Sequence, residues 1–294
     1  MNLILIKEKE ISNTGVIDLQ PTDERAKHIL QHLKKTTGDE VSIGCIQESQ
    51  NGYKCKAQVK LQQNNGVQLI PKPNTIIQSP IVPEITLILA VPFPARLKYL
   101  WPVLSSFVGV TRVVIIRSAL SNPEFELSKA LQKSTYAPML EKGMSQGGRT
   151  RPVKVDVCLD ENESISDTLQ RLGLIGRSNN DGIARILLDC GDENVTPPPA
   201  RDVIIKHCSN IENGSVVLAI GPERGWSESE ANMFVTECGF EAASLGSSIL
   251  RVDTAVISGL AICSATLDEC HEEYSDRGVK RKRQDDTNSS ITNS

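Results

Sequence analysis

The sequence is poor in aromatic residues and has no strong excess of charge of either sign. Phe, Trp and Tyr make up 4% of its 294 residues, so a core must consist mainly of Ile, Val, Leu and Ala. The formal net charge is −4, from 32 Lys and Arg against 36 Asp and Glu. Proteins that bind nucleic acid through overall charge are usually basic, and this balance excludes that mode of binding. Any nucleic-acid contact must therefore come from local basic patches or from shape.

The cysteines and histidines show no metal-binding pattern. Eight cysteines and four histidines are scattered along the chain, and no C-x-x-C pair occurs among them. Zinc sites usually need such pairs or a cluster of His and Cys, so the sequence predicts no metal site. The isolated cysteines are typical of reduced core residues in a reducing compartment.

Long hydrophobic runs are also missing. No segment approaches the ~18 consecutive apolar residues that a membrane-spanning helix needs. Residues 1–7 have neither the apolar core of a signal peptide nor the Arg- and Ser-rich composition of a transit peptide. We therefore expect a cytoplasmic protein without a membrane partner. The basic run from Lys280 to Arg283 leaves a nuclear address or an RNA contact open as alternatives to a solubilising tail.

Residues 1–78 have the pattern of a small β-rich domain with one helix. Residues 3–6, 41–46 and 53–59 are expected to be strands, and Asn51-Gly52 is a strong hairpin signal. A helix capped by Thr22 or Asp23 is predicted from apolar residues at helical spacing, namely Ala26, Ile29, Leu30 and Leu33.

A second domain follows a linker marked by four prolines between residues 71 and 83. Continuous apolar runs occupy residues 85–91, 112–116, 183–188 and 215–220, and helical segments separate them. Such runs are typical of strands in a parallel sheet that is buried on both faces. The sequence therefore predicts an α/β domain over residues 84–270.

Helix signals support this α/β alternation. A capping Asn and a Pro at the first helical position predict a helix over residues 123–142. Ser227 and Glu230 form a capping box, and a last helix is expected over residues 253–267. Residues 271–294 are polar and are predicted to be a disordered tail.

Two glycine-bearing turns follow predicted strands. They are Gly-Pro-Glu-Arg-Gly-Trp at residues 221–226 and Leu-Gly-Ser-Ser-Ile-Leu-Arg-Val-Asp-Thr-Ala at residues 245–255. Open α/β sheets bind ligands at the carboxyl ends of their strands, and glycine allows a ligand to approach the backbone closely. Each turn by itself is also compatible with an ordinary strand-to-helix connection. Together they predict a ligand site.

The combined sequence of these turns resembles the C-terminal signature of the ribosomal RNA small subunit methyltransferase E (RsmE) family. The positions that agree with the family pattern are Gly221, Pro222, Glu223, Gly225, Ser227, Glu230, Gly239, Phe240, Leu245, Gly246, Ile249, Leu250, Arg251, Thr254 and Ala255. Residues 146–152 and 28–39 are similar to upstream segments of the same family, and the order of segments agrees over residues 25–265.

The resemblance implies a homodimer with a PUA-like β-barrel over residues 1–78. A SPOUT methyltransferase domain with a trefoil knot would follow over residues 84–270. It implies S-adenosyl-L-methionine as cofactor and N3 of a uridine in 16S ribosomal RNA as the methylated atom. Ribosomal RNA or the assembled small subunit would then be the partner. The implied cofactor-binding residues are Leu188, Ile220, Gly221, Pro222, Glu223, Gly225, Leu245, Gly246, Ile249, Leu250, Thr254 and Ala255.

Arg251 and Glu223 are the candidate catalytic residues of such an enzyme. Methyl transfer to N3 of uracil creates negative charge on the base, which the permanently charged Arg251 could stabilise. We expect Ile249 and Leu250 to anchor this loop in the core and to aim Arg251 outward. The alternative is that Arg251 pairs with Glu223 and only holds two loops together. Glu223 would otherwise accept a hydrogen bond from the ligand or act as a base.

Other side chains are candidates for contacts with RNA. Lys34, Arg149 and Arg151 could bind phosphates, or they could belong to solvated basic surfaces. Trp226 could stack on a base or on adenine, and the alternative is a Trp packed in the core or in an interface.

The sequence departs from the family pattern at a few positions. Arg224 replaces a glycine, Asp253 replaces a glutamate, and residues 92–95 differ from the family's basic segment. Two further hypotheses therefore stay open. The chain could be a SPOUT methyltransferase for another RNA site, or a catalytically idle homologue that binds RNA during ribosome assembly.

Overall fold

The computed structural model describes residues 3–47, 52–80, 82–176, 181–189, 196–209 and 211–291, with side chains described as far as residue 274. The chain divides into two compact units. The first contains residues 1–81, 101–108 and 136–153, and the second contains residues 82–100, 109–135 and 154–294. The change of unit at residues 81 and 82 falls in the predicted linker. Two helical segments from beyond the linker nevertheless belong to the first unit.

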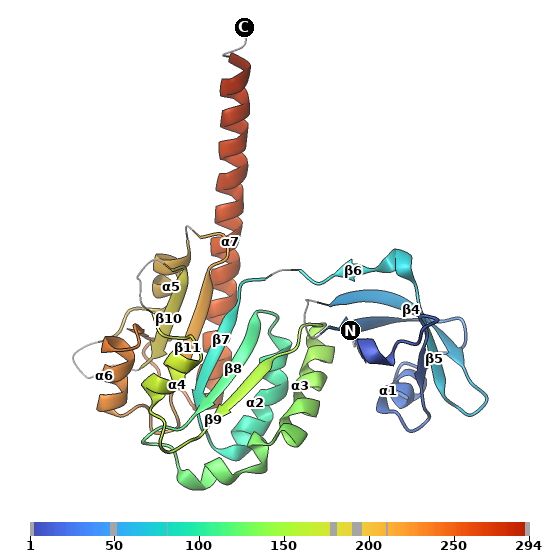
Figure 1. Ribbon diagram of the computed structural model, residues 1–294, viewed down its shortest axis with the longest axis horizontal. Helices are drawn as coiled ribbons and strands as arrows, with labels where there is room; N and C mark the ends of the chain where they lie inside the picture. Colours follow the sequence, from blue (N-terminus) through green and yellow to red (C-terminus); the bar gives the residue numbers. More distant parts are fainter. Residues whose placement is uncertain are drawn as a thin grey trace. The chain divides into compact units, whose positions relative to one another are not determined.

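The first unit is built on a six-stranded sheet (Figure 1). Its strands are β1 (Ile4–Lys7), β2 (Ile17–Leu19), β3 (Glu40–Ile46), β4 (Tyr53–Leu61), β5 (Val67–Pro71) and β6 (Ile77–Gln78). The order is β1-β3-β4-β5-β2, and β6 pairs with β4. β1 runs parallel to β3, while the other pairs are antiparallel. β3 and β4 pair as the sequence predicted, and Asn51 of the expected turn lies outside the described residues.

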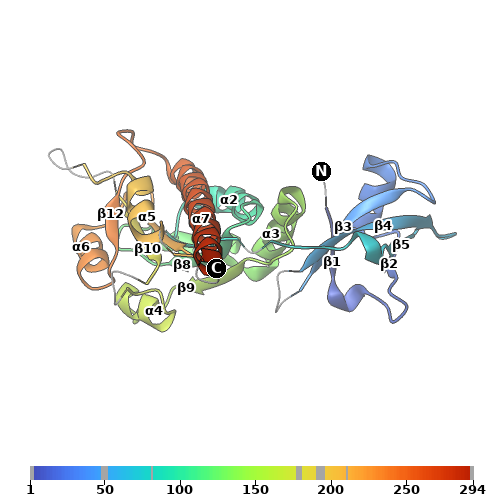
Figure 2. The same cartoon turned by 90° about the horizontal axis from the view of Figure 1, so that it is seen from above.

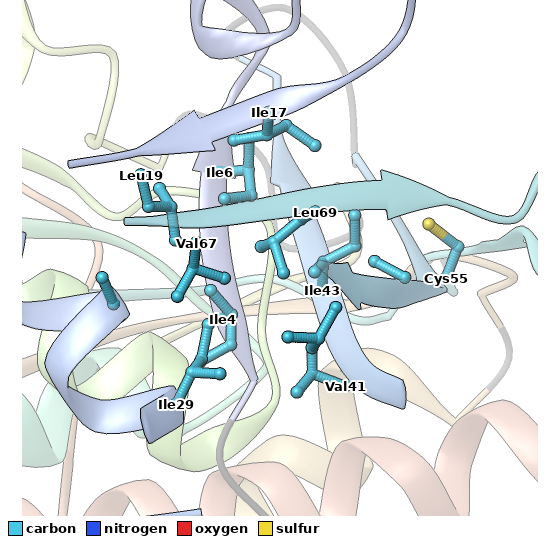
Figure 3. Close-up of a cluster of buried hydrophobic side chains, with 13 residues drawn as sticks. Ile4, Ile6, Ile17, Leu19, Ile29, Val41, Ile43, Cys55, Val67 and Leu69 are labelled. Carbon is cyan, nitrogen blue, oxygen red and sulfur yellow. The ribbon is translucent and has the colours of Figure 1, made fainter. Parts of the chain in front are cut away.

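The predicted amphipathic helix covers one side of this sheet's core. It consists of α1 (Glu24–Lys27) and a π-helical turn, η2 (His28–His32). Asp23 is the cap, because its carboxylate accepts a hydrogen bond from the Arg25 amide at 2.8 Å. Figure 3 shows Ile29 beside Ile4 among the buried side chains of the strands. Alternate strand residues thus point into one apolar core, as the sequence pattern predicted.

The helices α2 (Pro94–Ser106) and α3 (Lys133–Gly147) each begin in the second unit and end in the first. Within the first unit they approach each other closely at Gly143, where a Cβ atom would overlap the Pro102 carbonyl oxygen. The Ser105 hydroxyl also donates to the Leu140 carbonyl at 2.8 Å. α3 is tied to the sheet, because the Leu3 amide donates to the Ser145 carbonyl at 3.2 Å.

The second unit is a doubly covered parallel sheet, as the continuous apolar runs predicted. Its strands are β7 (Ile85–Ala90), β8 (Val110–Ile116), β9 (Lys154–Cys158), β10 (Ile183–Leu188), β11 (Ser215–Ile220) and β12 (Glu241–Ala243). Every pair is parallel, and the order is β12-β10-β11-β7-β8-β9.

Helices lie on both faces of this sheet (Figure 2). α4 (Ile165–Arg171) and α6 (Glu228–Thr236) bury Leu169 and Phe234 against one face. α5 (Ala200–Cys208) and α7 (Val252–Ile291) contact the other face and each other. Gly259 permits the contact of α7 with the sheet, since a Cβ atom there would lie 3.1 Å from Leu218 on β11 and 3.3 Å from Leu188 on β10.

Two sequence predictions about helices were wrong. The helix expected over residues 123–142 is divided into η4 (Pro123–Leu127), η5 (Lys129–Leu131) and α3. Ser128 interrupts it by capping η5 with its own side chain. α7 extends to Ile291, well beyond the expected end of the last helix at residue 267 (Figure 1). Residues 271–291 contain no proline, and the Glu, Arg, Lys and Gln residues at 272–273, 277 and 280–284 favour helix. Residues 292–294 lie outside the described part.

Candidate functional site

A cavity of about 600 Å³ lies in the second unit, at the carboxyl ends of β10 and β11. This volume is within the ~300–1,000 Å³ range of small-molecule sites, and strand ends are the usual ligand position in α/β sheets. Eleven of the predicted cofactor-binding residues line it: Leu188, Ile220, Gly221, Pro222, Glu223, Gly225, Leu245, Gly246, Ile249, Leu250 and Ala255. Thr254 does not line the cavity. Residues more than thirty positions apart in the sequence thus line one cavity. Their role in cofactor binding stays a prediction.

The first wall of the cavity is the turn that follows β11. The Gly225 amide donates to the Pro222 carbonyl at 2.9 Å and closes the turn. Gly225 takes the left-handed conformation with φ +74°, which glycine adopts at little cost. Arg224 needs no positive φ, because among the described non-glycine residues only Lys34 and Asn65 have one. The turn therefore accommodates an arginine where the family has glycine.

Gly221 serves the turn itself more than an approaching ligand. A Cβ atom at this position would lie 3.1 Å from the Gly225 carbonyl carbon and 3.2 Å from the Trp226 amide nitrogen. The close approach is thus between the two ends of the turn. The expectation that glycine lets a ligand approach the backbone is therefore joined by a second reason for glycine at this position.

The second wall is the loop between β12 and α7. Gly246 has φ +112° and open space where a side chain would be. Among the described residues, no amide from Leu245 to Arg251 donates to a protein acceptor. Ile249 is 89% exposed, so the prediction that it anchors the loop in the core was wrong. The apolar side chain at the cavity and the free amides are both available to a bound molecule.

Glu223 has different partners from those the sequence suggested. Its Oε1 accepts hydrogen bonds from the Arg96 guanidinium at 2.7 Å and from the Phe93 amide at 3.0 Å. Both donors lie at the N-terminus of α2, which follows β7. The alternative in which Arg251 pairs with Glu223 is therefore wrong. The carboxylate is engaged in structure, which makes it a poor candidate for a free base.

Arg251 lines the cavity and is largely exposed to solvent. Its side chain is 66% exposed, and its Nε lies 3.3 Å from Oδ1 of Asp253. Its Nη2 donates to Oδ2 of the same carboxylate at 3.4 Å. A guanidinium with two long contacts on one edge keeps its other N–H groups free for an anionic partner.

Trp226 combines the two roles that the sequence left open. Its ring packs on Phe234 with centroids 4.8 Å apart, and it is partly buried against the core below α6. It also lines the cavity, and its buried Nε1 has no hydrogen-bond partner among the described residues. A buried indole N–H normally has an acceptor, so this group is a donor available to a ligand.

The three candidate RNA contacts all belong to the first unit and differ in exposure. Lys34 is exposed and lies two residues after η2, in the left-handed conformation with φ 50°. Arg151 is half-buried. Arg149 is only 2% exposed and donates to the Phe107 carbonyl at 2.6 Å and to the Arg151 carbonyl, and burial lowers its pKa to about 10. A surface phosphate contact by Arg149 is therefore contradicted by its burial.

Sequence reasoning missed Arg96 as a residue of this site. It lines the cavity and bridges the first turn to the start of α7, with Nε 3.9 Å from Oδ1 of Asp253. Its position just after the apolar run at residues 85–91 was the available signal. Nothing in the local sequence could name Glu223, which is 127 residues away, as its partner.

The described residues contain no group of three or more His, Cys, Asp and Glu side chains placed to hold a metal ion. None of the described helices is both long and apolar enough to cross a membrane.

Comparison with known proteins identifies this fold and cavity as those of an RNA methyltransferase domain. The family model for the RNA methyltransferase domain matches residues 78–264, which is more than half of the chain, and the chain belongs to this family. A curated relative, ribosomal RNA small subunit methyltransferase E of Treponema pallidum (strain Nichols), is 25% identical over 267 residues. That alignment covers 90% of this chain and 91% of the relative. The enzyme of the same name from Rickettsia conorii is 30% identical over 69 residues, 24% of this chain and 28% of the relative.

Solved structures share the fold over about nine-tenths of the chain. Ribosomal RNA small subunit methyltransferase E from Neisseria gonorrhoeae, bound to S-adenosyl methionine, superposes with a TM-score of 0.60 at 18% identity. It covers 89% of this chain and 95% of that one. A putative methyltransferase from Legionella pneumophila with bound SAM gives 0.61 at 18% identity, covering 90% and 98%. A probable rRNA-methyltransferase from Porphyromonas gingivalis gives 0.63 at 19% identity, covering 90% and 99%.

Proposed function

We propose that this protein transfers a methyl group from S-adenosyl-L-methionine to N3 of a specific uridine in small-subunit ribosomal RNA. The observation that carries the proposal is the cavity in which the turns at residues 221–226 and 245–251 meet beside Leu188. It lies inside the matched RNA methyltransferase domain. The relatives that carry the name of a small-subunit methyltransferase support the choice of RNA.

The residues present fit S-adenosyl-L-methionine. The apolar residues Leu188, Ile220 and Leu250 suit an adenine ring, while Trp226 offers an unpartnered donor. The amides from Leu245 to Arg251 can hold polar edges of the ligand through the backbone. S-adenosyl-L-methionine supplies a sulfonium methyl group that is open to nucleophilic attack. The site's own work is to hold that methyl in line with the nucleophile, which is catalysis by positioning.

Arg251 is the residue that we assign to the substrate side of the site. The sulfonium is positive, so the guanidinium is stable when it faces the base or a phosphate instead. Transfer of the N3 proton to solvent leaves negative charge on the uracil, and the exposed Arg251 guanidinium stabilises that charge. Glu223 contributes by holding the first turn against α2, through its hydrogen bonds to Phe93 and Arg96.

We further infer that the second unit carries a trefoil knot and that the N-terminal sheet is a PUA-like barrel. The path from β11 through α6 to the edge strand β12, and back to α7 over β11 and β7, supports the knot. The six-stranded mixed sheet around the apolar core in Figure 3 supports the barrel. Both features would give the enzyme the SPOUT architecture.

The enzyme is proposed to act as a homodimer in the cytoplasm, on ribosomal RNA or the assembled small subunit. Small residues on α7 would allow a second copy to approach this helix closely, but Gly259 already packs within the chain against Leu188 and Leu218. Ala261 is exposed on the same helix and stays available to a second copy. Light scattering of the purified chain at micromolar concentration would give twice the chain mass if the dimer forms.

Nucleoside mass spectrometry tests the proposed activity. Small-subunit RNA would be incubated with the protein and S-adenosyl-L-methionine, digested, and searched for 3-methyluridine. Its formation supports the proposal, a different methylated nucleoside would favour another RNA site, and no product despite cofactor binding would favour an idle RNA-binding protein.

A further inference from the structure

Four charged side chains form an alternating chain along one side of the cavity. Glu223 pairs with Arg96 at 2.7 Å, Arg96 lies 3.9 Å from Asp253, and Asp253 lies 3.3 Å from Arg251. These residues come from the turn after β11, the start of α2 and the start of α7 with the loop before it. The chain thus connects both walls of the cavity to the proposed catalytic arginine.

Arg96 is held at a position that does not favour a cation by itself. It lies in the first turn of α2, where its amide donates to the Phe93 carbonyl at 2.9 Å. The N-terminus of a helix carries positive partial charge and disfavours a guanidinium there. Two carboxylates, Glu223 and Asp253, offset this cost, and all three side chains are less than one-third exposed. The arrangement therefore depends on the acids around Arg96.

Asp253 stands between two cations. Its Oδ1 is buried without a hydrogen bond, yet it lies within ion-pair distance of both Arg96 and Arg251. Its attraction is therefore divided between a guanidinium that is 26% exposed and one that is 66% exposed. The long contacts to Arg251 follow from this division, because a carboxylate without a second cation would draw Arg251 closer.

We infer that Arg96 is a positioning residue that keeps Arg251 available to the substrate by sharing Asp253. The expected effect on kcat rests on the proposed methyl transfer, whereas the expected movement of the Arg251 side chain does not. Removal of Arg96 leaves Glu223 and Asp253 without their common cation. Asp253 then has Arg251 as its only cation and draws it closer. Fewer N–H groups of Arg251 consequently face the RNA.

The test compares Arg96→Gln with the double variant Arg96→Gln/Asp253→Asn. Arg96→Gln is expected to lower kcat about tenfold while the Kd for S-adenosyl-L-methionine changes less than threefold. Neutralising Asp253 in the double variant frees Arg251 again and is expected to restore kcat to within about threefold of the wild type. A role limited to holding the fold predicts no such rescue, because the second change removes one more ion pair.

Two controls keep the result interpretable. Arg112→Gln removes an ion pair that resembles the Arg96–Glu223 pair in length and burial, because Arg112 lies 2.6 Å from Asp156. Arg112 belongs to the same unit but does not line the cavity. Its substitution is expected to leave kcat unchanged. Arg96→Lys keeps the charge and folds even if the glutamine variant does not, and it should retain an intermediate kcat because a point charge cannot contact both acids as a guanidinium does.

Arginine side-chain NMR separates this inference from the proposed function. The Nε–H signal of Arg251, assigned with Arg251→Lys, should move in Arg96→Gln and return toward its original position in the double variant, with no RNA present. An unmoved Arg251 signal, or a loss of kcat that Asp253→Asn does not rescue, would overturn the inference. A wild-type protein that binds cofactor but methylates no RNA would overturn the proposed function instead, and the NMR result would still stand.

Discussion

The carboxylate of Glu223 accepts a hydrogen bond from the Phe93 amide at 3.0 Å and thereby caps the helix that carries Arg96. The first helical amides have no partner within their own helix, so an anion at this point stabilises α2. One side chain thus fixes the turn after β11 to the segment after β7. Glu223 is a structural part of the cavity wall.

Glu223→Gln distinguishes this role from general-base catalysis. Glutamine keeps an oxygen that can accept from Phe93 but loses the ion pair with Arg96, so kcat should fall tenfold at most. Loss of a general base typically costs about 10²–10⁴-fold. Steady-state methylation with tritiated cofactor measures the difference, and a fall of a thousandfold with intact cofactor binding would reinstate Glu223 as the base.

Arg251→Ala should separate cofactor binding from methyl transfer. We expect the Kd for S-adenosyl-L-methionine to stay within about twofold, by calorimetry, because the positive sulfonium disfavours a guanidinium as a cofactor contact and the Arg251 side chain is 66% exposed. Methyl transfer should fall by about two orders of magnitude, the usual cost of losing one donor to developing charge. Arg251→Lys should recover little of it.

Arg201→Ala is the matched control for this experiment. Arg201 is also an exposed arginine in an ion pair, 2.8 Å from Glu269, but it lies on α5 and does not line the cavity. Its loss should leave both measurements unchanged. If Arg251→Ala abolished cofactor binding, Arg251 would belong to the cofactor site instead of the substrate side.

The adjacent residues Arg224 and Gly225 of the first turn should respond differently to substitution. Gly225→Ala forces a side chain into the left-handed region, at a cost of about 1–2 kcal/mol, so cofactor affinity should fall about tenfold. Arg224→Ala should leave it unchanged, because Arg224 does not need that conformation. Calorimetry of the two folded variants measures this difference. Equal losses in both would show that the arginine itself contacts the cofactor.

The sequence was informative where structure depends on near neighbours. Ser227 and Glu230 form the predicted capping box, with the Ser227 amide donating to Oε2 of Glu230 at 2.9 Å. The alternation of apolar runs likewise predicted the parallel sheet. Such features depend on period and spacing, which a single chain displays directly.

Features that depend on tertiary packing could not be predicted in the same way. Arg149 looks like a surface cation in sequence but lies buried among backbone carbonyls. Ile249 looks like an anchor but is exposed at the cavity. The partner of Glu223 comes from 127 residues earlier in the chain. In each case, the deciding neighbour is brought near only by the fold.

Arg149 and Lys34 should therefore differ in their effects on stability and RNA binding. Arg149→Gln deprives the carbonyls of Phe107 and Arg151 of their donor, which should lower the free energy of unfolding by about 1–3 kcal/mol. It should not change the salt dependence of RNA affinity. Lys34→Gln should leave stability nearly unchanged and reduce the slope of log K against log salt by about 0.7–0.9. Filter binding across a salt series and urea unfolding check the pair, and the reverse pattern would place Arg149 on the RNA.

Acid should remove part of the stability of the first unit. Side-chain hydrogen bonds from Arg25 lower the pKa of Asp23. Burial raises the pKa of Glu10, but hydrogen bonds from Arg25 and the Lys7 amide, together with the positive charges of Arg25 and Lys7, bring it below its ordinary value. Carboxyls with lowered folded pKa values stabilise above their unfolded values of about 4 and lose that contribution as pH falls through the folded values. Arg25→Gln should thus lower the urea midpoint at pH 7, and the difference from wild type should shrink below pH 4.

Lys27→Gln is the control for this pH series. It removes an exposed pair with Glu24, and such surface pairs contribute about 0–1 kcal/mol. A difference between Arg25→Gln and the wild type that persists unchanged at pH 3 would show that Arg25 acts through packing instead of charge.

The direct test of the central claim is the nucleoside content of small-subunit ribosomal RNA treated with the full chain and S-adenosyl-L-methionine. Mass spectrometry should detect 3-methyluridine at one position, in amounts that saturate near one per RNA. Arg251→Ala should form it about a hundred times more slowly while binding the cofactor normally. Wild-type protein that binds the cofactor and the RNA yet forms no 3-methyluridine would contradict the account.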